Sequence, residues 1–424
     1  MRSTMFVSVS LLIRLLFLAA TICSTAQVRP APQSYLITTL GALGGTVSDA
    51  GSAINSRGMA VGGADLSGDT VEHATLWING TLIDLGTLGG PNSGSAAINQ
   101  GGEVVGVAQT STIDPLGEQW GSLLTCTATG GPCQAPNLVL GFEWQGGKMK
   151  PLATLGGNNG FALAVNNRGQ IAGVAEKGVA GKDCVPPQIL EFEAVIWGPQ
   201  MGSIRELPPL PGDSIGTAFG INDAGQAVGS SGPCGLSVAS LVHATLWQGN
   251  SVIDLGSFGG EVANFANAIN NQGQIVGESD LPGDATGHAF LWQNGELTDL
   301  GTLPGDFFSA ANAINDEGQV VGESCDVAGN CRAFFWQDGV MTDLNTLVSA
   351  NSVYLLAAKG ISSKGEIAGQ AFDPASGNVI GFVATPSRAT LTRSGQPHQR
   401  IILPVQVRWQ LRQSRGVGPL SSSH

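Results

Sequence analysis

Residues 313–322 read Ala-Ile-Asn-Asp-Glu-Gly-Gln-Val-Val-Gly, and this stretch decides the fold because versions of it recur along the chain. In each version an aliphatic residue precedes a small polar one, a glycine follows three positions later, and the copy ends in a second glycine. The aliphatic residue of the seven copies is Ile54, Ile98, Val165, Ile221, Ile269, Ile314 or Ile361, and the last copy has Ser362 in place of asparagine. Spacings of 44 to 67 residues between copies are typical of a repeat architecture.

Turn chemistry makes each copy a pair of antiparallel strands. Asparagine at the first position and glycine at the fourth, as in Asn315 and Gly318, suit a type I turn followed by a left-handed residue. A second recurrent block is clearest over 288–303, where Asn294-Gly295 is a strong hairpin signal. Each repeat therefore predicts four short strands, which is the content of one propeller blade.

Three details predict a closed ring. The positions one and three before each aliphatic residue hold only Gly, Ala or Ser, as innermost strands crowded around an axis require. The chain starts with an orphan fourth strand at 35–41, and the last repeat has a third strand at 381–385 but no fourth. We therefore predict an all-β, seven-bladed β-propeller of four-stranded antiparallel blades, closed by the N-terminal strand completing the last blade. An open solenoid, or a six-bladed ring with one extra module, is the alternative.

Composition agrees with an all-β chain. Glycine makes up 62 of 424 residues, about twice the usual share, and charged residues make up 12%, about half of it. With 42% hydrophobic residues the chain can form a core, which excludes disorder and collagen. Residues 27–386 hold 11 basic and 32 acidic residues, a net charge of −21, which argues against binding of nucleic acid.

The two ends differ from the repeats. Residues 1–26 predict a secretory signal peptide, with Arg2 and Arg14, an apolar stretch at 15–20 and small residues before position 27. A membrane anchor is the alternative for this segment, and no other run is long enough to span a membrane. The repeats fill 27–386, while 387–424 carries six Arg and no acid. We expect this tail to be a flexible arm; its alternatives are attachment to anionic envelope polymers and docking onto the acidic ring.

Six cysteines remain after cleavage, an even number that suits disulfides in an oxidising compartment. Cys126 and Cys133 flank one glycine-rich turn, and Cys325 and Cys331 flank another, so each pair is expected to close its own loop. The two left over occupy equivalent loops of adjacent repeats and are candidates for a disulfide between blades: Cys184 and Cys234. We expect no metal at the cysteines, because no histidine lies near them.

These residues resemble the HAF family of bacterial extracellular repeat proteins, named for a His-Ala-Phe triplet. The resemblance covers 35–386; His288-Ala289-Phe290 matches the triplet, and the segments starting at His73, His243 and Arg332 are variants of it. It implies export and a propeller-like repeat, and it supplies no catalytic residues.

Candidate binding residues lie in the loops between second and third strands and in the loops entering each blade, which share one face. Two large insertions, 107–139 and 174–190, enlarge that face. Trp120, beside Glu118, would stack on a sugar or anchor a partner, or would instead form the small core of its insertion. Phe307 and Phe308, in the loop entering blade six, allow the same two interpretations.

We find no catalytic constellation, because the positions expected to line the channel lack a carboxylate pair or a histidine. Three histidines share one strand position around the ring and are expected to be structural: His73, His243 and His288. Calcium is a minor possibility at two acidic loops that otherwise form solvated turns, with carboxylates at Asp65, Asp69, Asp280 and Asp284.

The sequence thus predicts a non-catalytic binding or scaffolding propeller that acts as a monomer. It would be secreted to the extracellular space, or held in the periplasm or envelope, and would recognise a glycan or a protein through its loop-rich face. A polysaccharide-active enzyme with acids in the two insertions, and a purely structural envelope protein, are the alternatives.

Overall fold

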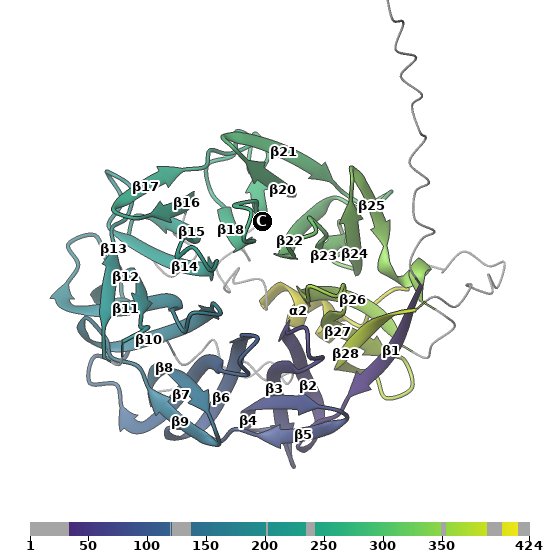
Figure 1. Ribbon diagram of the computed structural model, residues 1–424, viewed down its shortest axis with the longest axis horizontal. Coiled ribbons are helices and arrows are strands. Elements are labelled where there is room, and N and C mark those ends of the chain that lie inside the picture. Colours follow the sequence, from purple (N-terminus) through teal and green to yellow (C-terminus); the bar gives the residue numbers. More distant parts are fainter. Residues whose placement is uncertain are drawn as a thin grey trace, which may run out of the picture.

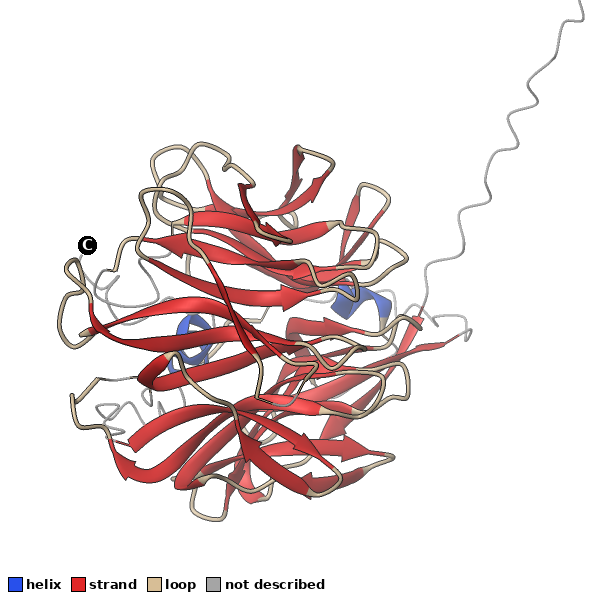
Figure 2. Cartoon of the chain, turned by 60° about the vertical axis from the view of Figure 1, so that its left-hand side comes forward, coloured by secondary structure: helices blue, strands red, loops and turns tan. Residues whose placement is uncertain are grey.

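The computed structural model describes residues 34–118, 120, 137–200, 202–234, 242–348, 353–387 and 401–413. In this part of the chain 28 strands form seven four-stranded antiparallel sheets, which stand as blades around a central axis (Figure 1). The helical segments of the described residues are η2 (Leu344–Leu347) and α2 (Val405–Gln413), drawn in blue in Figure 2. The predicted seven-bladed propeller is confirmed, whereas the expected signal peptide lies outside the described residues.

The strands of each blade follow one another in sequence from the axis outward. Blades 1 to 3 consist of β2 (Gly44–Ile54), β3 (Ala60–Leu66), β4 (Glu72–Ile78), β5 (Thr81–Asp84); β6 (Gly89–Ile98), β7 (Val104–Ile113), β8 (Asn137–Gln145), β9 (Lys148–Pro151); and β10 (Gly156–Val165), β11 (Ile171–Ala180), β12 (Leu190–Trp197), β13 (Ile204–Leu207). Blades 4 to 6 consist of β14 (Ile215–Ile221), β15 (Ala227–Gly232), β16 (His243–Gln248), β17 (Ser251–Asp254); β18 (Asn264–Ile269), β19 (Ile275–Asp280), β20 (Gly287–Gln293), β21 (Glu296–Gly301); and β22 (Phe308–Ile314), β23 (Val320–Cys325), β24 (Cys331–Gln337), β25 (Val340–Asp343).

Blade 7 closes the ring. It consists of β26 (Tyr354–Ile361), β27 (Ile367–Asp373) and β28 (Asn378–Ser387), with β1 (Ser34–Leu40) as its outermost strand. β1 and β28 pair antiparallel from Ser34 opposite Ser387 to Leu40 opposite Gly381. The predicted closure by the N-terminal strand is therefore confirmed, and it leaves neither end of the ring as an unpaired edge.

Packing between blades explains the small residues of the repeat. In the inner strand, a Cβ on Gly220 would lie 3.2 Å from the Cα of Ala268 in the next blade. The Val-Val-Gly glycine is equally confined: a Cβ on Gly277 would lie 1.8 Å from the carbonyl oxygen of Phe265 and 2.9 Å from the ring of Phe290. Position 277 therefore accepts only glycine, because a bulge in the inner strand and the Phe of the His-Ala-Phe triplet both press on it.

The asparagines of the repeat join the blades as well as forming turns. Asn222, for example, accepts hydrogen bonds from two N–H groups of its own turn and donates from Nδ2 to the carbonyl oxygen of Asn270 in the next blade. Six such links of 2.9–3.1 Å run from blade to blade, donated by Asn55, Asn99, Asn166, Asn222, Asn270 and Asn315. At the seventh junction Ser362 still caps its turn, but among the described residues its side chain makes no bond to blade 1.

Part of the basic tail lies on the ring. Helix α2 (Val405–Gln413) is near the centre of the ring beside β26 (Figure 1). The side chains of Leu403, Val407 and Leu411 are 1–3% exposed and pack with Tyr354 and Phe372 of blade 7. Residues 401–413 thus contact the ring mainly through apolar side chains, whereas 388–400 and 414–424, for which a flexible arm was also expected, lie outside the described residues. No helix of the described segments is long and apolar enough to cross a membrane.

Candidate functional site: a pocket on the loop-rich face

The loops that differ most between blades gather on one face, called here the loop-rich face. It carries the connections between second and third strands and the connections entering each next blade. On this face a pocket of about 230 Å³ lies between blades 5 and 6. Ala285 and Thr286 line it from blade 5, Phe307 and Phe308 from the loop entering blade 6, and residues 325–329 from the next loop of blade 6. The structure thus brings together the two phenylalanines that the sequence singled out.

The backbone around the pocket is held in place by its own hydrogen bonds. The Thr286 hydroxyl donates to the carbonyl oxygen of Phe307 at 2.5 Å, and the N–H of Phe307 donates to the carbonyl oxygen of Cys325 at 2.8 Å. Asp326 accepts from the N–H groups of Ala328 and Asn330, both at 2.9 Å. These bonds leave apolar side chains at the rim, where Phe307 is 42% and Val327 is 78% exposed.

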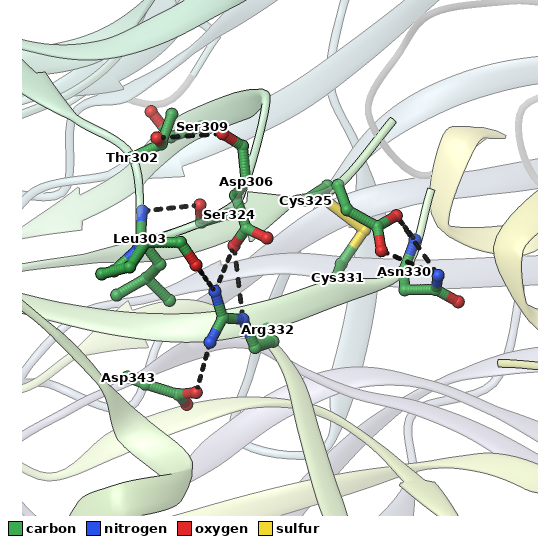
Figure 3. A network of polar contacts seen from close by, with 12 residues as sticks. Thr302, Leu303, Asp306, Ser309, Ser324, Cys325, Asn330, Cys331, Arg332 and Asp343 are labelled. Atoms are coloured by element: carbon green, nitrogen blue, oxygen red, sulfur yellow. Dashed lines mark hydrogen bonds and ion pairs between the residues drawn. A yellow bond between two sulfur atoms is a disulfide. The ribbon is translucent and has the colours of Figure 1, made fainter. Parts of the chain in front are cut away.

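A buried ion network supports the same loops (Figure 3). Arg332 stands where other repeats have the histidine of the triplet. Its Nη2 donates to Asp306 at 2.8 Å and its Nη1 donates to Asp343 at 3.0 Å. The Asp306 side chain is fully buried and that of Arg332 is 14% exposed. A pair this buried is costly to break, because one charge would remain unpaired away from water, so Arg332 fixes the loop entering blade 6.

The disulfide between Cys325 and Cys331 closes the loop beside this network, as the sequence predicted (Figure 3). Within the described residues, one group of three possible metal ligands, Glu323 with these two cysteines, has its ligand atoms within 4.8 Å. The disulfide occupies both sulfurs. The disulfide between Cys184 and Cys234 joins blades 3 and 4, the pairing that the sequence left open. Cys126 and Cys133 lie outside the described residues.

Trp120, the leading candidate from the sequence, is not exposed. Its ring is 6% exposed and makes edge contacts with Phe161 at 5.0 Å and Phe192 at 5.3 Å between ring centroids. The expectation of an exposed, sugar-stacking Trp120 is therefore corrected, because the residue is buried. The alternative, that it forms the core of its own insertion, depends on 119 and 121–136, which lie outside the described residues. The residues it packs on belong to blade 3, so the insertion of blade 2 is attached to its neighbour.

Glu118, two residues away, is also buried, at 2% exposure. Its Oε1 accepts hydrogen bonds from the N–H groups of Ile189 and Leu190, both at 2.8 Å, and from the amide of Gln188 at 3.2 Å. The same Gln188 amide donates to Glu176 at 3.1 Å. Glu118 thus links the insertions of blades 2 and 3 by hydrogen bonds, and its burial keeps it from contacting a ligand on the surface.

Glu176 is the residue that sequence reasoning missed. It is fully buried in β11, and burial, with the Glu118 carboxylate adding to it, raises the pKa of Glu176 to about 8. The N–H and the side-chain amide of Asn159 donate to it at 2.8 and 3.1 Å. Near neutral pH the buried carboxyl group of Glu176 is therefore mostly protonated. The signal in the sequence was only an acid within the second strand, followed directly by Lys177.

In the acidic loops considered for calcium, carboxylates accept hydrogen bonds from the backbone of the segment that enters the same blade. Asp69 accepts from the N–H of Thr46 at 2.6 Å, and Asp284 and Asp280 accept from N–H groups of 261–263 at 2.7–3.3 Å. Burial raises the pKa of Asp280 to about 6, and the Asp284 carboxylate adds to this rise. Each acid thereby holds the loop that enters its own blade. Calcium remains a prediction for the four carboxylates: Asp65, Asp69, Asp280 and Asp284.

The three histidines outside the tail are each paired with an aspartate near the rim of a blade. The Nδ1 atoms lie 2.9–3.0 Å from carboxylate oxygens in the pairs His73–Asp84, His288–Asp299 and His243–Asp213. Two of these aspartates also accept from the glycine N–H two residues later, which fixes the turn after the outer strand. These contacts fit the structural role that the sequence indicated, in three separate blades.

Comparison with known proteins yields the fold alone. No family model and no curated protein matches the sequence. Similar solved structures include the β-propeller domain of the Trilobed protease from Pyrococcus furiosus, with 12% identity over 69% of this chain and 79% of that one and a TM-score of 0.44. A puromycin hydrolase mutant has 12% identity over 78% of this chain and 51% of its own, with a TM-score of 0.47. TolB from Acinetobacter baumannii has 11% identity over 67% and 63%, with a TM-score of 0.37.

Proposed function

We propose that this chain is a secreted, non-catalytic binding propeller of the HAF type, which recognises an extracellular glycan or protein at the pocket between blades 5 and 6. The disulfides suit an oxidising compartment outside the cytoplasm. The acidic charge of the ring disfavours nucleic acid as the ligand.

The observation that carries the proposal is the exposed apolar rim of a pocket whose backbone is already fixed. Phe307 and Val327 keep 42% and 78% of their surface in solvent, while hydrogen bonds, a disulfide and the Arg332 network hold the loops that present them. Apolar side chains on a rigid, concave surface favour binding, because little conformational entropy is lost when a partner covers them.

The alternative of an enzyme with acids in the insertions has one observation in its favour, the pair of Glu118 and Glu176. A carboxyl group with a raised pKa beside a second carboxyl group is what acid–base chemistry uses. However, the two side chains are 2% and 0% exposed and are bonded to the backbone and to Gln188, so a substrate would have to unfold the insertions to reach them. We therefore interpret the pair as structural.

The test is binding by residues 27–424, produced through an oxidising route, on an array of plant, fungal and bacterial polysaccharides. Phe307→Ala should lower binding at least tenfold. Leu36→Ala is the matched control, since Leu36 is 54% exposed on β1 at the outside of blade 7. Trp120→Ala is a poor probe, because it removes a buried ring.

Each outcome has a definite meaning. Binding that Phe307→Ala abolishes and Leu36→Ala preserves supports the pocket. Binding that survives Phe307→Ala places the glycan site elsewhere and refutes the pocket. A folded protein that binds no polysaccharide refutes the glycan half of the proposal and leaves a protein ligand.

A further inference from the structure

The tail helix α2 rests in an apolar groove on the loop-rich face, between blades 6 and 7. The groove is formed by the disulfide of Cys325 and Cys331, by Tyr354 of β26, and by Phe372 and Val379 at the ends of β27 and β28. All of these residues belong to strands whose pairing is complete without the helix. The groove is therefore a feature of the ring itself.

The helix fits this groove by a simple pattern. Leu403, Val407 and Leu411 are spaced by four residues, so they lie along one side, and each is 1–3% exposed. The polar contacts are few among the described residues: the N–H of Leu403 donates to Asn330 at 2.9 Å, and Arg408 Nη1 donates to the carbonyl oxygen of Ala328 at 2.9 Å. The backbone of Ile401 also hydrogen-bonds to the Tyr354 side chain. The tail is therefore held by apolar anchors, one arginine and backbone hydrogen bonds just before the helix.

The attachment of α2 is reversible on physical grounds. A nine-residue helix is too short to be stable alone in water, so α2 must fold as it docks. The cost of ordering it offsets much of what the three buried side chains contribute. Ile402, which precedes the helix, and Val405, its first residue, point away from the ring, at 84% and 71% exposure.

We propose that this groove is a binding site for a basic amphipathic helix of a partner protein, and that α2 is the competitor that covers it in the free chain. The partner helix would carry apolar residues at positions i, i+4 and i+8 and a basic residue on the flank, which the net charge of −21 on 27–386 favours. The groove and the pocket of blades 5 and 6 share the 325–331 loop, but each can bind without the other, so this inference does not depend on the proposed function.

The experiment uses the full mature chain and a labelled peptide of residues 400–414. Val407→Asp with Leu411→Asp in the protein should release α2 and open the groove. Fluorescence anisotropy should then show at least tenfold tighter peptide binding by this variant than by the wild-type chain, where the tethered α2 competes at a high effective concentration. Ile402→Asp with Val405→Asp is the matched control, because those exposed side chains can change without undocking the helix.

Peptide variants test the chemistry of the partner. The peptide carrying Val407→Asp and Leu411→Asp should not bind, and the peptide carrying Arg408→Glu and Arg412→Glu should bind at least threefold more weakly. Trypsin cleavage after Arg408 gives an independent readout, which should be slow in the wild-type chain and at least tenfold faster in the opened variant.

Three results would overturn the inference. In the first, the opened variant is folded by circular dichroism and cleaved by trypsin, but it binds the wild-type peptide no better than it binds the peptide carrying Val407→Asp and Leu411→Asp. The second is equal peptide affinity of the wild-type and opened chains, which would mean that α2 does not cover the groove. The third is a wild-type dimer that the Val407→Asp and Leu411→Asp changes dissociate, which would assign the groove to a second copy of this chain.

Discussion

The links between blades can be tested at Asn222, because the protein contains its own comparison at Ser362. Asn222 is 3% exposed, and its Oδ1 accepts from the N–H groups of Ala224 and Gln226, both at 3.1 Å. Its Nδ2 donates to the Gln226 side chain at 2.7 Å and to Asn270 of the next blade at 3.1 Å. Ser362 makes the bonds within its own turn, accepting from two N–H groups and donating to Glu366, all at 3.2 Å, but among the described residues it has no counterpart of the bond between blades. Asn222→Ser should therefore remove the link and keep the cap.

The expected sizes follow from the number of bonds lost. Asn222→Ser loses the one bond between blades, which corresponds to about 1 kcal/mol of unfolding free energy. The carbonyl oxygen of Asn270 keeps the Gly273 N–H as a donor, so no buried acceptor is left alone. Asn222→Ala also loses the two capping bonds and the bond to the Gln226 side chain, which a serine hydroxyl can replace, and should cost about 3 kcal/mol. Ser362→Asn should add a seventh link at the closure and stabilise the ring by up to about 1 kcal/mol.

Urea unfolding followed by tryptophan fluorescence measures these differences, provided that the variants share one m-value. The order of stability should be Ser362→Asn, wild type, Asn222→Ser and Asn222→Ala. A cost for Asn222→Ser equal to that of Asn222→Ala would show that the capping bonds carry nothing. If Asn222→Ser were as stable as the wild type, or if Ser362→Asn were less stable, the idea that these bonds hold neighbouring blades together would be refuted.

Three further changes probe the loop-rich face. The pKa of Glu176 is about 8 in the folded protein and about 4.5 in the unfolded chain, so between these values the folded protein binds one proton more than the unfolded chain. The stability of the wild type should therefore fall as pH rises from about 5 to 9. Glu176→Gln should flatten that curve in urea melts at each pH, and an unchanged slope would contradict the raised pKa of Glu176. Arg332→Leu should lower the unfolding free energy by about 3 kcal/mol, because it leaves Asp306 buried without Arg332 as its partner. Arg332→Lys should lower it by less. If Arg332→Leu left the stability unchanged, the network would not be the support of the pocket. Changing Cys184 and Cys234 to Ser together should cost about 4 kcal/mol for a crosslink of 50 residues. Dithiothreitol should then shift the melt of the wild type more than that of the variant, which keeps only the short loop closed by Cys325 and Cys331 among the described disulfides.

The architecture could be predicted because the signals for turns and inner strands are local in sequence and recur in all seven repeats. Asparagine and glycine define turns, the small residues beside each Ile define the inner strand, and a missing fourth strand at one end matches a spare strand at the other. Each of these rules acts within a few residues of sequence. Even so, the asparagine was interpreted only as a turn residue, because its second bond goes to the next blade and depends on the ring being closed.

The site residues could not be placed by the same means. Whether Trp120 is exposed depends on Phe161 and Phe192, which lie 41 and 72 positions further along the chain. The insertions contain no repeat, so nothing in the sequence indicates which surface they cover. The docking of 401–413 was missed for a similar reason: a tail of six arginines was judged by its charge, whereas three apolar residues spaced by four attach it.

Blade 6 is where the departures from the repeat accumulate, and this supports the proposal that the ring binds its partner there. Arg332 replaces the histidine of the triplet, Cys325 and Cys331 fix the neighbouring loop, and Phe307 occupies the entrance to the blade. A regular blade needs none of these residues, since blade 5 folds with His288 and without a disulfide. The same disulfide loop lines the pocket on one side and contacts α2 on the other. A rigid loop between two apolar surfaces is what a binding propeller needs, because it presents both surfaces without an ordering cost.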